Sequence, residues 1–197
     1  MPAVHPHIFD LPTTINFDDV PDGTVIDSHY TAKGVTFASV TDQPPNQWSA
    51  YAREWQAAET KKNVISVNAL GTDAFFDASI GGIVATFTSP KRYVSIDAAP
   101  FVTAEDIGQS FNYKPFIEGF DAQGNFIQGL VTYYGPSYGD NDWGKWKPLV
   151  LMSTSTNIAF VRFSSQFHSS PPHVYGLFDH FVFSDRLPIN FLGRFRR

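Results

Sequence analysis

The chain contains no cysteine among its 197 residues. This absence excludes disulfide bonds, thiolate zinc sites and a cysteine nucleophile. No apolar run approaches the ~20 residues that a helix needs to span a bilayer. Charged residues make up only 17% of the chain and the formal net charge is −5. A nucleic-acid partner is therefore disfavoured, because no basic field is available to displace its counterions.

The N-terminal segment, from Met1 to His7, lacks the charged start and apolar stretch of a secretion signal. Either the protein is not exported by that route, or this is a mature chain with an added initiator methionine. The lack of cysteine is compatible with the cytosol and with many exported bacterial proteins. These features leave both locations open.

Short strand-like segments dominate what the sequence does contain. Residues of alternating polarity predict strands over 14–20, 34–39, 81–88, 92–97, 115–121, 125–131, 157–164 and 174–184. We expect two hairpins, one hinged at residues 89–91 and one at residues 121–124. Many short strands separated by Gly, Pro and Asn indicate an all-β sandwich or barrel. We expect a single domain over 1–197, with residues 1–12 and 187–197 as peripheral tails.

Two long connections interrupt this pattern, over residues 41–70 and 133–148. Together they hold all four tryptophans. The first contains one predicted short helix, at residues 49–60, in a stretch that could equally be a loop with one or two turns. Long loops on a rigid sandwich commonly carry binding or catalytic residues.

The two ends of the chain carry matching strand signatures. Residues 14–20 and 177–183 are both aromatic and β-branched runs that contain aspartate. If these runs pair as neighbours, Asp18 or Asp19 approaches Asp179. Nearby carboxylates repel each other unless a cation lies between them, and calcium prefers such oxygen ligands. We therefore expect a calcium ion bound by Asp18, Asp19 and Asp179. The alternative is that Asp18 and Asp19 cap a turn while Asp179 faces solvent.

Several of these segments, in this order, resemble bacterial exported jelly-roll domains related to galactose-binding and carbohydrate-binding modules. The similar segments are INFDDVPDGTV at 15–25, GVTF at 34–37, VATFTSPKRYVSI at 84–96, GFDAQGN at 119–125 and FDHFVF at 178–183. The closing strand of that family often reads Ile-Asp-Asn where this chain has Phe-Asp-His. The resemblance implies a jelly-roll β-sandwich of two antiparallel sheets, often with one structural calcium near the first and last strands. It also implies a lectin-like role in carbohydrate binding and a location outside the cell or at its surface.

Aromatic residues of the two long connections are the candidate ligand contacts. Sugars present flat apolar faces on which tryptophan and tyrosine stack, while neighbouring polar groups bind the hydroxyls. The candidate residues are Trp48, Tyr51, Trp55, Tyr138, Asp140, Asp142, Trp143 and Trp146. The alternative is that these rings pack the long connections onto the sandwich.

Two other functions fit the same scaffold. A glycoside hydrolase needs two suitably spaced carboxyl groups, and a polysaccharide lyase is a related possibility. Asp97, Glu118 and Asp121 could converge on one sheet face, although no spacing singles out a pair. A nucleophile elbow is absent because the chain has no Gly-x-Ser-x-Gly. A structural or assembly protein is the second alternative, since jelly rolls also build capsids.

Overall fold

The computed structural model describes residues 11–39, 49–54, 63–66, 82–101, 114–131, 146–166 and 175–187. Within these ranges the regular structure consists of twelve β-strands and one turn of 3-10 helix, η1 (Thr31–Lys33). No helix in the described part of the chain has the length and apolar character needed to cross a membrane.

A seven-stranded sheet forms one layer. Its strands, in spatial order, are β10 (Lys147–Met152), β7 (Tyr93–Phe101), β12 (Tyr175–Ser184), β5 (Asn63–Ser66), β4 (Tyr51–Glu54) and β2 (Thr24–Val25). The seventh, β1 (Thr13–Ile15), also pairs with β12. Because β7 occupies one edge of β12, β1 and β5 share the other edge.

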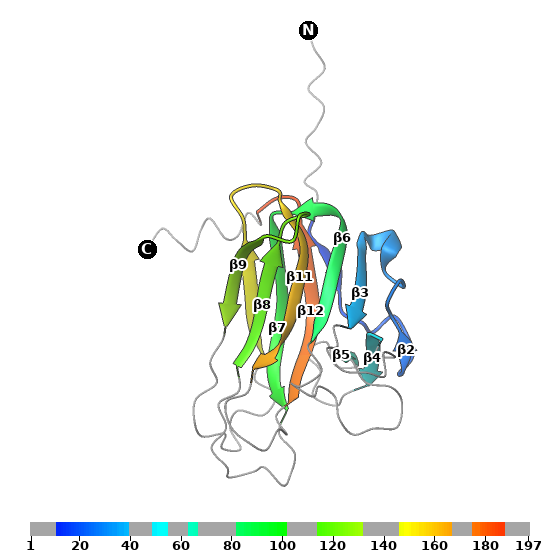
Figure 1. Ribbon diagram of the computed structural model, residues 1–197. Coiled ribbons are helices and arrows are strands. Elements are labelled where there is room, and N and C mark those ends of the chain that lie inside the picture. The colour runs from blue at the N-terminus through cyan, green and yellow to red at the C-terminus, as the bar shows by residue number, and fades with distance from the viewer. Residues whose placement is uncertain are drawn as a thin grey trace.

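A five-stranded sheet forms the second layer. Its order is β3 (Val35–Ser39), β6 (Ile83–Lys91), β11 (Ile158–Gln166), β8 (Lys114–Phe120) and β9 (Phe126–Val131). Figure 1 shows this sheet in front of β7 and β12. From β6 to β12 the chain changes sheet at every connection except the β8–β9 hairpin. The prediction of an all-β sandwich of two antiparallel sheets is confirmed.

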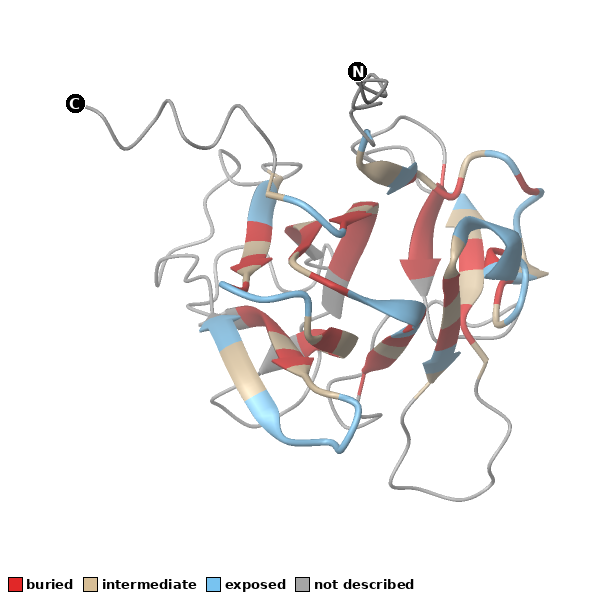
Figure 2. Cartoon of the chain, turned by 90° about the horizontal axis from the view of Figure 1, so that it is seen from above, coloured by how far each residue is buried: buried red, intermediate tan, exposed pale blue. Residues whose placement is uncertain are grey.

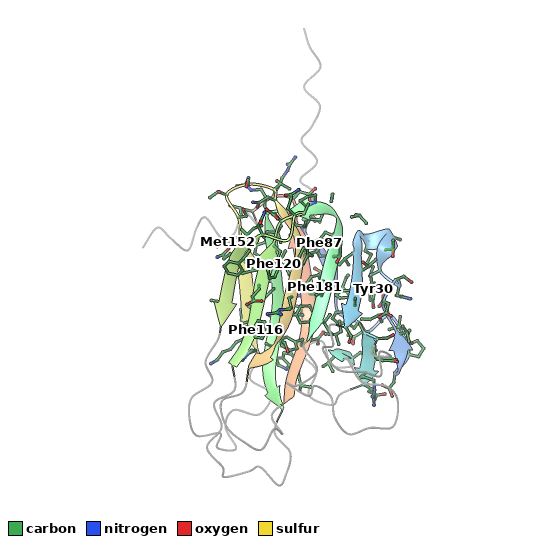
Figure 3. All side chains as sticks on the ribbon, viewed as in Figure 1. Tyr30, Phe87, Phe116, Phe120, Met152 and Phe181 are labelled. Carbon is green, nitrogen blue, oxygen red and sulfur yellow. The ribbon has the colours of Figure 1, made fainter. Side chains whose placement is uncertain are left out.

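The core lies between the two sheets and is rich in phenylalanine. Seen from above in Figure 2, buried residues lie on the strands and exposed residues lie mainly toward the rim. Phe181 of β12 bridges the layers, with ring centroids 5.5 Å from Phe37, 6.1 Å from Phe87 and 6.1 Å from Phe163. Figure 3 labels Phe87 and Phe181 in this region. Burying one such ring stabilises the fold by about 1.5–3 kcal/mol.

The predicted hairpin hinged at residues 89–91 is wrong. Strands β6 and β7 follow each other in sequence but belong to different sheets. Strand β6 continues to Lys91 and β7 begins at Tyr93, so only Arg92 separates them. One residue is shorter than the two-residue loops of the tightest common hairpins. The chain instead passes from one sheet to the other here. The apolar sides of β6 and β7 therefore face each other across the core.

The predicted helix over residues 49–60 is also wrong where the structure describes it. Residues Tyr51–Glu54 form β4, which pairs with β2 and β5. Ala50 and Ala52 are both fully buried, which is the period-two pattern of a strand. A short helix has little stability of its own, so strand pairing overrides the local propensity. The remaining residues of that prediction, 55–60, lie outside the described ranges.

Candidate functional site

Strands β1, β5 and β12 meet at one place, which we call the strand junction. Ile15 of β1 pairs with Phe181, and Ile65 of β5 pairs with Phe178. Between these two pairs, the register of β12 against β7 shifts after Asp179, and the following residue, His180, has a positive φ of 50°. The prediction that the first and last strands lie side by side is confirmed.

Asn63 holds the strand junction together. Its backbone N–H donates to Asp18 Oδ1 (2.8 Å), and its Nδ2 donates to the carbonyl oxygens of Phe17 (2.8 Å) and Val20 (2.9 Å). These bonds tie the segment after β1 to the start of β5. The side chain is fully buried, and its Oδ1 has no hydrogen-bond partner among the residues that the structure describes. Sequence reasoning missed Asn63, because nothing in its local pattern distinguishes it from a solvated polar residue.

Asp179 is completely buried at the strand junction. Its Oδ1 accepts a hydrogen bond of 2.6 Å from the backbone N–H of His180. Across the β7–β12 pair, Asp179 lies opposite Asp97, whose Oδ2 is 2.9 Å from His180 Nδ1. The alternative in which Asp179 faces solvent is therefore wrong. A buried carboxylate requires hydrogen bonds or a nearby cation to offset the loss of hydration.

Asp19 makes a different set of contacts, at η1. It accepts hydrogen bonds from Tyr30 Oη (2.5 Å) and Lys33 Nζ (3.1 Å). Burial raises the pKa of Asp19, but the bonds from Tyr30 and Lys33 and the Lys33 charge together hold it below its ordinary value. Burial, together with the Asp19 carboxylate, raises the pKa of Tyr30. The structure thus places Asp18 beside Asn63 of β5 and Asp179 on β12, and it uses Asp19 to fasten η1.

The described residues contain no group of three or more His, Cys, Asp or Glu side chains arranged to hold a metal ion. A cation at the strand junction would therefore need amide and carbonyl oxygens besides the two carboxylates. Calcium accepts such mixed oxygen ligands.

Most of the sequence-predicted ligand residues lie outside the described residues, namely Trp48, Trp55, Tyr138, Asp140, Asp142 and Trp143. The two that are described, Tyr51 and Trp146, lie on the outer face of the seven-stranded sheet. Tyr51 alternates with the core residue Ala52 on β4, and Trp146 immediately precedes β10.

The half-buried side chain of Trp146 lies on an apolar base. It packs against Val64 of β5, Ala99 of β7 and Leu177 of β12. Each of these residues is the outward-facing neighbour of a main-core residue, so the base belongs to the outer face of the sheet. Three different strands therefore fix the position of this ring.

A charged pair near Tyr51 joins Arg53 of β4 to Asp22, which precedes β2. Arg53 Nε is 3.0 Å from Asp22 Oδ1, which also accepts a hydrogen bond from the Glu54 backbone N–H. Burial raises the pKa of Asp22, but the Glu54 N–H and Arg53 together hold it below its ordinary value. Arg53 pairs across the sheet with Val64, which belongs to the base under Trp146. The outer face thus combines aromatic rings with a fixed ion pair.

The candidate catalytic carboxylates do not converge. Asp97 alternates with the core residues of β7 and faces outward from the seven-stranded sheet. Glu118 faces outward from the other sheet, where it pairs with Arg162. Asp121 lies in the β8–β9 turn and accepts hydrogen bonds from the Gln123 and Asn125 backbone N–H groups. The expectation that these three could share one sheet face is wrong, because the sandwich separates Asp97 from Glu118.

Comparisons with known proteins identify similar domains only among solved structures. No family model and no curated protein matches the chain. One similar structure comes from work on the promiscuous specificity of carbohydrate-binding modules of the β-sandwich superfamily. It has a TM-score of 0.34 and 10% identity, and the match covers 84% of this chain and 62% of that one. This chain therefore spans less than two thirds of that structure's length.

A second similar structure is the family 32 carbohydrate-binding module of C. perfringens NanJ in complex with galactose. Its TM-score is 0.29 at 10% identity, with 82% of this chain and 98% of that chain covered. Both structures are of carbohydrate-binding modules.

Proposed function

We propose that this chain is a non-catalytic carbohydrate-binding domain that holds its ligand on the outer face of the seven-stranded sheet. The observation that carries the proposal is the position of Trp146 on the apolar base of Val64, Ala99 and Leu177. Tyr51 shares that outer face and would contribute to the same site. Trp48, Trp55, Tyr138, Asp140, Asp142 and Trp143, from the long connections, are the further proposed contacts.

The physical reason concerns the ordering cost of binding. A ring that three strands already hold in place loses little freedom when a sugar stacks on it, so more of the stacking energy appears as affinity. The Arg53–Asp22 pair, held at 3.0 Å, supplies a nearby donor and acceptor for hydroxyl groups. Aromatic rings beside a few fixed polar groups are the usual composition of small-molecule sites.

Calcium at the strand junction is the second part of the proposal. Asp18 and Asp179, together with backbone carbonyl oxygens, would hold the ion, which would neutralise the buried carboxylate and cross-link the first and last strands. Burying a charged group away from water is costly unless a counter-charge or hydrogen bonds offset the loss of hydration. The complete burial of Asp179 supports the proposal because a cation would offset that cost. Asp19 is left out, since Tyr30 and Lys33 engage its two oxygens.

Affinity electrophoresis against neutral polysaccharides tests the proposed site. We expect Trp146→Ala to weaken retention roughly tenfold and Trp146→Phe to weaken it less, in line with the loss of one aromatic contact. Leu11→Ala, at an exposed apolar residue before β1, is the matched control and should leave retention unchanged. Wild-type retention in Trp146→Ala would remove this face from the account. Release of reducing or unsaturated sugar ends would identify an enzyme instead.

A further inference from the structure

The β8–β9 hairpin, which the sequence predicted, presents a surface on the opposite side of the molecule. Its turn is held by Asp121, whose Oδ1 accepts hydrogen bonds from the Gln123 (2.9 Å) and Asn125 (2.8 Å) backbone N–H groups. Gly124, with φ of 81°, provides the left-handed residue that the turn needs. Phe126, the first residue of β9, follows directly. The turn therefore sets the starting position of this side chain.

A register shift places Phe126 and Gly129 on the same outer face. Gly119 pairs with Gln128, but the next residue, Phe120, pairs with Phe126, so Ile127 is the extra residue of a bulge. Residues three apart on a regular strand face opposite sides, whereas the bulge restores Phe126 and Gly129 to one side. Glu118, the partner of Gly129, shares this face.

The Phe126 ring lies along its own strand. Its Cζ and Cε2 atoms are 3.2 and 3.3 Å from the position that a Cβ would take on residue 129. Because Gly129 has no side chain, the ring can extend over the backbone there, and the residue remains 61% exposed. One side of the ring is thus directed toward β9 and the other is open to solvent.

Phe120 forms a wall beside this ring. The two ring centroids are 5.9 Å apart and the ring planes meet at 74°. Phe120 in turn stacks on Phe160 of β11, with centroids 5.0 Å apart and planes within 9° of parallel. The Phe126 ring and the stacked Phe120–Phe160 pair therefore form two aromatic surfaces that meet at a steep angle. Figure 3 shows Phe120 on β8, in this part of the sheet.

An ion pair lies beside the Phe126 ring, near Gly129. Glu118 Cγ is 3.5 Å from the same Cβ position on Gly129. Glu118 Oε2 accepts hydrogen bonds from Arg162 Nη2 (2.8 Å) and Nε (3.0 Å) on the neighbouring strand. The Arg162 guanidinium also lies 5.6 Å from the centre of the Phe116 ring. Both hydrogen bonds use Oε2, which leaves Oε1 as an acceptor in the described part of the protein.

We propose that Phe126, Phe120, Glu118 and Arg162 form a second glycan site, which binds one neutral pyranose unit of a polysaccharide. It rests on the proposed function in that the protein binds carbohydrate, but it uses no residue of the Trp146 site. The apolar face of a pyranose matches a single aromatic ring, and its hydroxyls can donate to Glu118 Oε1 and accept from Arg162. An anionic sugar would be repelled by Glu118 and by the net charge of −5.

The size of the apolar surface favours a sugar over a second copy of the chain. The exposed large apolar residues in the described ranges are Leu11, Val25, Phe126 and Leu130. Leu130 pairs with the core residue Ile117, so it lies on the other side of β9 and does not enlarge the patch. A stable dimer buries about 800 Å² on each partner, whereas one phenylalanine offers roughly 200 Å².

Affinity electrophoresis in hydroxyethylcellulose, xylan, galactomannan and polygalacturonate tests the proposal. We expect at least one neutral polymer to retard the protein and Phe126→Ala to reduce that retention roughly fivefold. Leu130→Ala, an exposed apolar residue of the same strand, is the matched control and should behave as wild type. Gly129→Val keeps the Phe126 ring but displaces it from its seat, and should weaken retention as well.

The same variants made in a Trp146→Ala background separate this site from the first. Weakening by Trp146→Ala with no effect of Phe126→Ala overturns the second site and leaves the proposed function standing. Weakening by Phe126→Ala alone supports the second site and overturns the first. Retention by no polymer overturns both. Stronger retention by polygalacturonate, or a dimer in light scattering that Phe126→Ala dissociates, also overturns the second site.

Discussion

The two outer faces of the sandwich each carry an aromatic ring, but they hold it differently. Trp146 is half-buried on side chains from three strands, whereas Phe126 is 61% exposed and extends over a glycine. Burial of apolar area stabilises the folded state, so Trp146 contributes to stability whether or not a ligand binds. An exposed ring contributes little to stability, so packing accounts poorly for Phe126. Trp146 therefore combines a packing role with its proposed ligand role, whereas Phe126 has a proposed ligand role alone.

The largest expected effect is the difference in stability between truncations of the two rings. We expect Trp146→Ala to lower the free energy of unfolding by about 2 kcal/mol, roughly half the cost of removing a fully buried ring. Phe126→Ala should change it by less than about 0.5 kcal/mol, as is usual for a surface site. Urea denaturation followed by circular dichroism measures both values. Equal losses would show that Phe126 is also part of the packing, and the contrast between the faces would disappear.

Calcium removal should affect the seven-stranded sheet, because the strand junction belongs to it. If free calcium is tenfold above its Kd, the ion stabilises the fold by about 1.4 kcal/mol. Chelation should then lower the Tm by about 3–5 °C for a chain of this size. Differential scanning calorimetry with EDTA and with added calcium measures this shift.

Two carboxylate variants serve as the matched pair for that experiment. Asp18→Asn should abolish the response to chelator, because Asp18 contacts Asn63 at the strand junction. Asp19→Asn should retain the response, because Asp19 contacts Tyr30 and Lys33 instead. Identical melting curves in EDTA and in calcium would rule out a stabilising ion.

The sequence predicted those parts of the fold that local pattern determines. Alternation located β11 and β12, and the turn residues at 121–124 identified the β8–β9 hairpin. The similar patterns of the two chain ends predicted the pairing of β1 with β12. In each case, the residues that determine the structure lie within one segment, or in two segments with similar sequence patterns.

Features that depend on contacts between distant segments escaped prediction. The sheet that β7 joins is set by its partners β10 and β12, and β4 is a strand because β2 and β5 flank it. The role of Asn63 follows from carbonyls 43 and 46 residues away in sequence. The Phe126–Gly129 arrangement depends on a bulge, which appears only once β8 and β9 are in register. No local periodicity reports such contacts.

The Glu118–Arg162 pair allows a smaller test of the exposed face. Partly exposed ion pairs contribute at most about 1 kcal/mol, so Glu118→Gln and Arg162→Met should leave the Tm within about 2–4 °C of wild type. Both should nevertheless weaken retention by neutral polysaccharide, because they remove a hydrogen-bonding group beside Phe126. Loss of stability without loss of binding would make the pair a purely structural contact.

The smallest expected effect is a loss of stability in acid. It concerns η1, a region that contains neither Trp146 nor Phe126. Asp19 has a lowered pKa, through Tyr30 and Lys33 acting against burial, so its ionised form is favoured by folding. This contribution is fully present above the unfolded value of about 3.9 and is lost as pH falls through the lower folded value. The Asp19 side chain is 45% exposed, and solvent screening limits the effect to about 0.5 kcal/mol. Thermal melts of wild type and Asp19→Asn should therefore differ at pH 6 and converge toward pH 3. A constant difference across that range would mean that the charge of Asp19 does not stabilise η1, and that its effect on the fold comes from shape and neutral hydrogen bonding alone.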